Sequence, residues 1–285
     1  MDLLAITFLI LFLISLVIGK LLNKSYDKAL APIVVILIIT ISSWASSSIS
    51  SSFEVLKLIS LSIAYALITI LMTYIIGLLL DMRKTELKLI KYETKLNFIL
   101  AILAGWILGQ FLPKNLPYTT LISYELLILA IAAGISVGKL FSIDLLKKSA
   151  KITLLTCIAA ISGAVISGVL NSFLFGIDIK ASISICLGMG WYTYIGPLLA
   201  NYEGSFIGNL AFLSNFLREQ FTFIIVPFIK GNPSSLISIG GATSMDDTLP
   251  IFISRLGKEY SIPSISSGFI LTLLVPILVP IIFAF

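Results

Sequence analysis

Two adjacent carboxylates, Asp246 and Asp247, stand inside a long apolar stretch of the chain. They close the segment GGATSMDD, which begins at Gly240 and lies within the apolar run 236–253. An ionisable group at bilayer depth costs roughly 2.5–3.5 kcal/mol on insertion scales, so such groups mark ion or substrate paths. Two glycines followed by small and hydroxyl-bearing residues favour a broken helix whose freed backbone groups line a polar cavity. We therefore interpret this segment as part of a transport site.

A half-helix is expected to follow the break. Thr243 or Ser244 would cap it, and its positive N-terminal end would attract a substrate carboxylate. Asp246 and Asp247 would then fall in its first turn, where the same end stabilises a negative charge. Pro250 would weaken the helix that continues from there.

A second group of polar residues lies in the apolar run 205–229. Asn215 and Glu219 are four residues apart and share a helix face. Arg218 precedes Glu219 by one residue, so its side chain leaves a helix roughly 100° away and contact between the two charges is not automatic. Two interpretations stay open: a structural ion pair between helices, or a carboxylate that binds a cation or carries a proton.

A third motif, GMGWYTYIGPLL from Gly188 to Leu199, contains three glycines and a proline that interrupt a helix. Trp191 and Tyr192 supply amphipathic rings there, and tryptophan is the best aromatic partner for a cation. The alternative is an aromatic belt at the membrane interface. The position of these rings in the middle of the run favours a place in the cavity.

The composition indicates a protein that is surrounded by membrane lipid. Hydrophobic residues make up 58% of its 285 residues and charged residues 12%, with a mean hydropathy of +1.10. A soluble domain averages about 25% charged residues. The chain has length for about eight to ten membrane helices of about 20 residues and for no soluble domain. The apolar start of the chain, which lacks a basic segment before it, is interpreted as a retained helix and not as a signal peptide.

Side chains that often carry chemistry are scarce. The sequence contains no histidine, which removes the commonest metal ligand and the commonest general base near neutral pH. Cys157 and Cys186 match no metal or redox spacing and are interpreted as buried thiols. We therefore expect no cofactor, no metal and no enzymatic activity. The net charge of +5 is better explained by membrane orientation than by binding to nucleic acid.

The linkers between the apolar runs predict an orientation. Twelve basic residues follow the first, third and fifth runs, and three follow the second, fourth and sixth; the twelve are Lys20, Lys24, Lys28, Arg83, Lys84, Lys88, Lys91, Lys95, Lys139, Lys147, Lys148 and Lys151. Because basic loops stay in the cytoplasm, both termini are predicted to lie outside a multi-pass cytoplasmic membrane protein. The same basic residues would contact anionic membrane lipids. Runs 181–200 and 234–254 either span, which gives ten crossings, or re-enter, which gives eight.

The predicted fold is therefore all-α and polytopic, with 8 to 10 transmembrane or re-entrant helices in a single transport domain, 1–285. Segments 1–81 and 97–175 look like two copies of a three-helix unit. Because each unit has an odd number of spans, the second copy would be inverted, as in many secondary transporters. The half 181–285 would carry the site through its two broken helices. The serine-rich stretch 42–52 would either line a polar path or form a short external loop.

With these motifs in place, the chain resembles a known family. The segments GMGWYTYIGPLL, LAFLSNFLRE, GGATSMDDTLP and SSGFILTLLVPILVP are similar, in order and spacing, to the LysO-type lysine exporter family of prokaryotic inner membranes. The resemblance implies efflux of L-lysine and eight spans. It carries over Arg218 and Glu219 at the family's Arg-Glu pair and Asp246 at its Ser-Met-Asp. Asp247 departs from the family pattern, so it would be an additional charge and not one of the core residues.

The sequence thus predicts a secondary transporter that exports L-lysine and close cationic analogues by proton antiport. Substrate would be bound by Glu219, Asp246, Thr243, Ser244, Asn215, Trp191 and Tyr192, and protons by Glu219, Asp246 and Asp247. A carboxylate in a medium of low dielectric constant can bind either a proton or a cation. The alternatives are a cation/proton antiporter or channel without an amino-acid substrate and, less favoured, a membrane-embedded enzyme. A homo-oligomer is left open.

Overall fold

The computed structural model describes residues 3–22, 27–48, 52–82, 97–113, 115–140 and 149–284, and within these residues it contains helices and no strand. The all-α prediction is therefore confirmed. Most of the basic linker residues behind the predicted orientation lie outside the described residues, so that orientation stays a prediction. The helices in chain order are α1 (Leu3–Leu22), α2 (Asp27–Ser48), α3 (Ser52–Leu80), α4 (Asn97–Phe111), α5 (Tyr118–Leu140), α7 (Ala150–Phe175), α8 (Ile179–Leu187), α9 (Tyr192–Glu203), α10 (Ser205–Ile225), α11 (Pro233–Gly240), the 3-10 turn η1 (Gly241–Met245), α12 (Leu249–Leu256), η2 (Lys258–Tyr260) and α13 (Ser261–Ala284).

Several helices have the length and composition of membrane spans. Among the described residues, four stretches are long and apolar enough to cross a bilayer: Phe53–Leu80, Tyr118–Ser136, Ala150–Phe175 and Lys258–Ala284. Large apolar side chains also face outward along α1, including Leu13, Ile14 and Val17. An outward apolar surface of this kind is what a protein surrounded by lipid presents, because the lipid tails solvate it.

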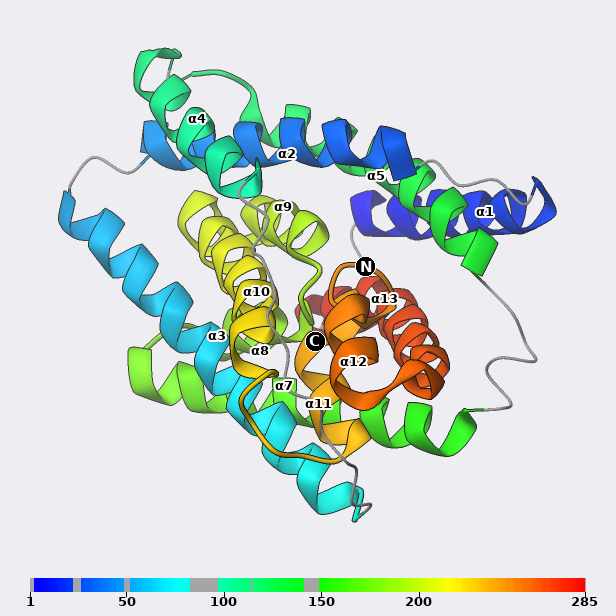
Figure 1. The fold of residues 1–285 in the computed structure, drawn as a ribbon. Helices are drawn as coiled ribbons and strands as arrows, with labels where there is room; N and C mark the ends of the chain where they lie inside the picture. The colour runs from blue at the N-terminus through cyan, green and yellow to red at the C-terminus, as the bar shows by residue number, and fades with distance from the viewer. Residues whose placement is uncertain are drawn as a thin grey trace.

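The helices form two layers (Figure 1). One contains α1, α2, α4 and α5, and the other contains α3 and α7 to α13. Glycines hold the first layer together. A Cβ atom at Gly138 of α5 would lie 2.1 Å from the carbonyl oxygen of Leu16 on α1, and one at Gly109 of α4 would lie 2.3 Å from that of Ser43 on α2. Such close backbone approach is how helices associate in lipid, where no hydrophobic force drives them together.

The serine-rich stretch contributes to the same layer. Helix α2 continues to Ser48, so residues 42–48 form no loop; residues 49–51 lie outside the described residues. Ser43 is buried, and its hydroxyl donates a hydrogen bond to the carbonyl oxygen of Gly105 on α4 at 2.9 Å. The serines at this contact are therefore small packing residues between α2 and α4.

In the second layer, α8 and α11 approach each other from opposite ends of α3. Helix α8 runs parallel to α3, because the hydroxyl groups of Tyr65 and Ser182 lie 2.8 Å apart and Thr69 donates to the sulfur of Cys186 at 3.4 Å. Helix α11 runs antiparallel to α3. Ser238, near the end of α11, contacts the carbonyl of Thr73. The first turn of α11 packs one turn further along α3, near the end of that helix.

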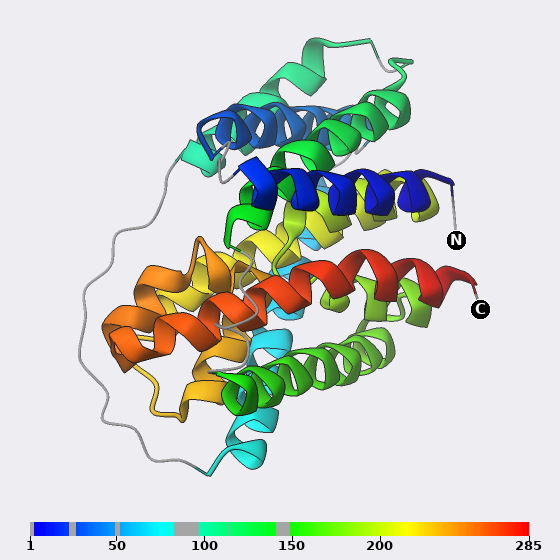
Figure 2. The ribbon, with the colours of Figure 1, turned by 90° about the vertical axis from the view of Figure 1, so that its right-hand side faces the viewer.

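Both half-helices belong to hairpins that fold back. Near the end of α12, Arg255 donates to the carbonyl oxygen of Ile229 at 2.8 Å, which brings α12 back to the end where α11 begins. Helix α9 packs antiparallel to α10, with Gly196 against Phe212 and Gly208 against Ala200. Since α10 ends just before α11 begins, α9 returns to the end where α8 starts. Figure 2 shows that α1 begins and α13 ends on one side of the bundle.

Candidate functional site

The tips of the two hairpins touch in the middle of the second layer. The amide of Ala242, in η1, donates a hydrogen bond of 2.8 Å to the carbonyl oxygen of Met189, in the turn between α8 and α9. The backbone there is unusual: Met189, Gly190 and Gly241 have φ angles of 49°, 90° and 62°. Gly241 is required, because a Cβ at that position would lie 2.4 Å from the Met189 carbonyl oxygen. The two helix breaks predicted from sequence are therefore confirmed, and they form one structural unit.

Asn215 of α10 holds the first tip. Its side-chain oxygen accepts a hydrogen bond from the amide of Gly190 at 2.8 Å, and its side-chain nitrogen donates to the carbonyl oxygens of Ile185 and Ala211 at 2.8 and 2.9 Å. This amide thus replaces hydrogen bonds that the backbone loses where α8 ends. We predicted a substrate contact for Asn215. The structure shows it bonded to main chain, where it positions the α8–α9 turn, and the substrate contact stays a prediction.

Arg218, one turn further along α10, holds the second tip. Its guanidinium donates through Nε to the carbonyl oxygen of Ile239 and through Nη2 to that of Ser238, both at 2.9 Å. These carbonyls belong to the C-terminal end of α11, which carries partial negative charge, so a buried cation is stabilised there. The residue is 2% exposed. Helix α10 therefore carries, on one face, the side chains that fix both hairpin tips.

The predicted acidic residues act on one aromatic side chain. The phenol of Tyr192, at the start of α9, lies within electrostatic reach of the carboxylates of Glu219, Asp247 and Asp246. Glu219 is buried at 1% exposure, Asp247 is half-buried and Asp246 is exposed. Gln220 donates to Glu219 Oε1 at 3.3 Å. Four of the residues predicted to bind substrate or protons therefore interact electrostatically, and of the three acidic ones Asp246 is exposed at the protein surface.

The other predicted contacts lie elsewhere. Trp191 packs against Phe8 and Phe12 of α1, with ring centroids 5.8 Å away in each case, and against Tyr194 at 5.0 Å. It therefore joins the α8–α9 turn to the first layer. The rings form a packed cluster, and the predicted substrate contact of Trp191 stays a prediction.

The expected cap by Thr243 or Ser244 was wrong. Both residues lie in η1, where Thr243 donates to the carbonyl oxygen of Gly240 and Ser244 to those of Gly241 and Ser264. Helix α12 begins only at Leu249, so Asp246 and Asp247 precede it and do not lie in its first turn. The helix begins later than predicted because proline is accepted in a first helical turn, so α12 starts immediately before Pro250.

The site offers carboxylates to a cation. Three acidic side chains lie within electrostatic reach of one phenol near the junction of two broken helices, where charge is expensive unless it serves a ligand. Among the described residues, no group of three histidine, cysteine or acidic side chains is close enough to hold a metal ion. The chemistry that fits is binding of an ammonium group or of protons.

Sequence reasoning missed the role of Arg218 and Asn215 as clamps, because hydrogen bonds to distant carbonyls leave no local pattern.

Comparison with known proteins adds a family. The profile of the family described as "Lysine exporter LysO" matches residues 99–283, a range that contains both hairpins and the three acidic residues. Lysine exporter LysO of Escherichia coli is 34% identical over 127 residues, which cover 44% of this chain and 42% of that protein. A putative lysine exporter of Haemophilus influenzae is 34% identical over 116 residues, 40% of this chain and 60% of that protein. The matched stretches thus span less than two thirds of either relative. No solved structure matches the chain significantly.

Proposed function

The chain belongs to the lysine exporter LysO family, and from this premise we propose that it exports L-lysine across the cytoplasmic membrane. The observation that carries the proposal is that the carboxylates of Glu219, Asp246 and Asp247 all act electrostatically on the phenol of Tyr192, near the junction of the two hairpins. Lysine carries two ammonium groups and one carboxylate at neutral pH. A site with several carboxylates is complementary to that charge and would repel an acidic amino acid.

Within this site, Glu219 and Asp246 bind the two ammonium groups or exchange them for protons. Glu219 is the buried member, so its charged form depends most on a bound cation. Asp246 is exposed and meets the substrate first, and Asp247 adds attraction beside it. The substrate carboxylate lies against the η1 turn that contains Thr243 and Ser244, through main-chain amides, since both hydroxyl groups donate to carbonyl oxygens. Exchange of lysine for protons at these carboxylates is antiport.

The helix arrangement supports eight crossings with both termini outside. The α8–α9 and α11–α12 hairpins fold back to the ends from which they start, so each re-enters the membrane and does not cross it. With basic linkers in the cytoplasm, α11–α12 enters from inside and α8–α9 from outside. Two opposed hairpins that meet at the site provide an inner and an outer gate, which is what alternating access requires.

The pairing of helices supports inverted repeats. Helix α1 packs on α5, and α4 packs on α2; if the units are α1–α3 and α4–α7, these are equivalent contacts with the units exchanged. Helices α3 and α7 pack on each other, as elements on a two-fold axis do. The same exchange relates the two hairpins, because α8 packs on α7 and α11 packs on α3. Substrate sites in such transporters lie between the repeats.

The test is transport by the purified protein in vesicles preloaded with labelled lysine, with and without an imposed pH gradient. We expect efflux that the gradient accelerates and that Glu219→Gln reduces by about tenfold or more, a factor equivalent to about 1.4 kcal/mol of binding. Glu203→Gln is the matched control, because Glu203 is exposed at the end of α9. Flux of sodium or potassium without movement of lysine would overturn the proposed substrate and favour a cation antiporter or channel.

A further inference from the structure

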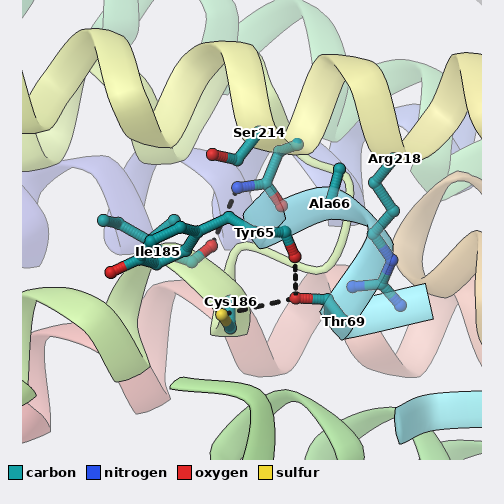
Figure 3. Close-up of a pocket in the computed structure, with 8 residues that line it drawn as sticks. Tyr65, Ala66, Thr69, Ile185, Cys186, Ser214 and Arg218 are labelled. Atoms are coloured by element: carbon teal, nitrogen blue, oxygen red, sulfur yellow. Dashed lines mark hydrogen bonds between the residues drawn. The ribbon is translucent and has the colours of Figure 1, made fainter. Parts of the chain in front are cut away.

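A small pocket lies on the face of α10 that is turned to α3 and α8 (Figure 3). None of its lining residues exposes more than 3% of its surface. The space is narrow: a water molecule fits, and an amino acid does not. The lining residues are Tyr65, Ala66, Thr69, Ile185, Cys186, Ser214, Asn215 and Arg218.

One donor of a residue that lines the pocket lacks a partner among the described residues. Arg218 uses Nε and Nη2 to hold α11, whereas its Nη1 is buried and makes no hydrogen bond to them. Figure 3 shows this side chain descending from α10 and ending beside Thr69. A buried donor of a charged group that makes no hydrogen bond costs about 1–3 kcal/mol of stability or more. A ligand in the pocket that accepts a hydrogen bond would recover that loss.

Two hydroxyl oxygens of the lining residues can accept hydrogen bonds. The hydroxyl of Thr69 gives its hydrogen to Tyr65 O or to the sulfur of Cys186, and the hydroxyl of Ser214 gives its hydrogen to Leu210 O. Each oxygen keeps lone pairs that can accept. The pocket therefore offers one donor and at least two acceptors.

This inventory selects the ligand. A cation would be repelled by Arg218. An anion would find a single donor and would lie near the negative C-terminal ends of α8 and α11. A neutral molecule that accepts one hydrogen bond and donates two matches all three groups, and among molecules that fit this space water does so.

We propose that an ordered water molecule occupies this pocket, accepting from Arg218 Nη1 and donating to Thr69 and Ser214. The water completes the hydrogen bonding of a buried guanidinium and joins α3 to α10. It thereby fixes the arginine that holds the tip of the α11–α12 hairpin. The inference rests on the pocket alone and does not depend on the transported substrate.

Radiolytic footprinting of the intact protein in isotopically labelled water tests the proposal, because hydroxyl radicals formed from a bound water modify adjacent side chains. Cys186 lines the pocket, and Cys157 is a matched control: it is free and buried, and its thiol contacts the carbonyl of Ser267. The two are 3% and 6% exposed. We expect Cys186 to be modified several-fold faster than Cys157, although Cys157 is the more exposed. Equal, slow modification of both would overturn the proposal.

Two variants locate the water. Ala66→Val places two methyl groups in the space, so the rate at Cys186 should fall to that at Cys157. Ser214→Ala removes one acceptor without filling the pocket, and a partial fall is expected. If Ala66→Val does not fold, Ser214→Ala decides the question. Unchanged modification of Cys186 in a folded Ala66→Val protein, or in Ser214→Ala when that alone folds, would show that radicals reach the thiol by another route and that no water is held there.

Discussion

The main-chain amide of Ala242 and the carbonyl oxygen of Met189, 53 residues apart in sequence, form a 2.8 Å hydrogen bond that joins the tips of two opposed hairpins. Around this bond the backbone of both tips is too close for an added side chain at Gly241. The junction is therefore a tightly packed contact between two elements that each fold back on themselves. A contact of this kind can exist in a joined and a separated state with little in between, because packed interfaces are not continuously deformable.

The first prediction concerns that junction. Gly241→Ala places a Cβ 2.4 Å from the Met189 carbonyl oxygen and forces alanine to a φ of 62° and ψ of −128°. Strained backbone alone costs about 1–3 kcal/mol, and the overlap adds to it. We expect a fall in thermal stability and loss of lysine efflux, measured on the purified protein.

Gly176→Ala separates strain from overlap. Gly176 also has a positive φ, 66°, at the end of α7, but nothing lies within 4 Å of an added Cβ there. Its substitution should cost only about 1–2 kcal/mol and leave transport unchanged. Equal effects of the two substitutions would mean that the tip junction has no special importance.

The second prediction concerns the clamp on α11. Arg218→Met leaves the carbonyl oxygens of Ser238 and Ile239 without their donors, at about 1–3 kcal/mol for each buried unsatisfied group. Arg218→Lys keeps the charge, but an ammonium lacks the rigid fork that reaches both oxygens. We expect thermal stability to decrease in the order wild type, lysine, methionine. A methionine variant as stable as the wild type would show that Arg218 does not hold the hairpin.

The breaks themselves could be predicted from sequence, because glycines next to polar and hydroxyl-bearing residues are poor material for a membrane helix. The sequence did not predict which residues these breaks bring close together. Glu219 and Tyr192 are 27 residues apart, and their approach depends on α9 folding back along α10. That packing comes from Gly196 against Phe212 and Gly208 against Ala200. Such complementary packing between two helices cannot be read from the sequence of either helix.

The partners of Asn215 and Arg218 were hidden for a related reason. Both are polar residues in an apolar helix, a pattern that predicts a buried polar contact without saying to what. The structure assigns them to carbonyl oxygens and an amide in helix breaks that are distant in sequence. Every residue type has the same main-chain groups, so the sequence of the partner segment does not indicate the contact. The position of Asp246 before α12 was missed because a short 3-10 turn has no periodic pattern.

The third prediction tests the fold of the hairpins in the membrane. Re-entrant hairpins place Glu203 outside and Lys230 inside, whereas spanning segments would reverse both positions. We expect Glu203→Cys to react with a membrane-impermeant thiol reagent in right-side-out vesicles, and Lys230→Cys to react in inverted vesicles. The native cysteines are buried and provide the background. Exchange of the two reactivities would establish ten crossings.

The last prediction asks which hairpin moves to admit substrate. Helix α12 has eight residues and joins the bundle through few neighbours, whereas α9 packs along α10, and the exposed carboxylate of Asp246 lies just before α12. Each hairpin ends at a glycine in a conformation that other residues avoid: Gly257 after α12 has φ 119° and ψ 162°, and Gly204 after α9 has φ 84° and ψ 175°. Movement of α12 requires rotation about Gly257. Gly257→Ala should therefore slow lysine efflux severalfold at a given stability; its Cβ would also lie 2.6 Å from the flexible end of Glu259, which can turn away. Gly204→Ala, where nothing lies within 4 Å of an added Cβ, has a similar positive φ and should lower stability with little effect on rate. If Gly204→Ala slows efflux more than Gly257→Ala does, the outer hairpin is the moving gate.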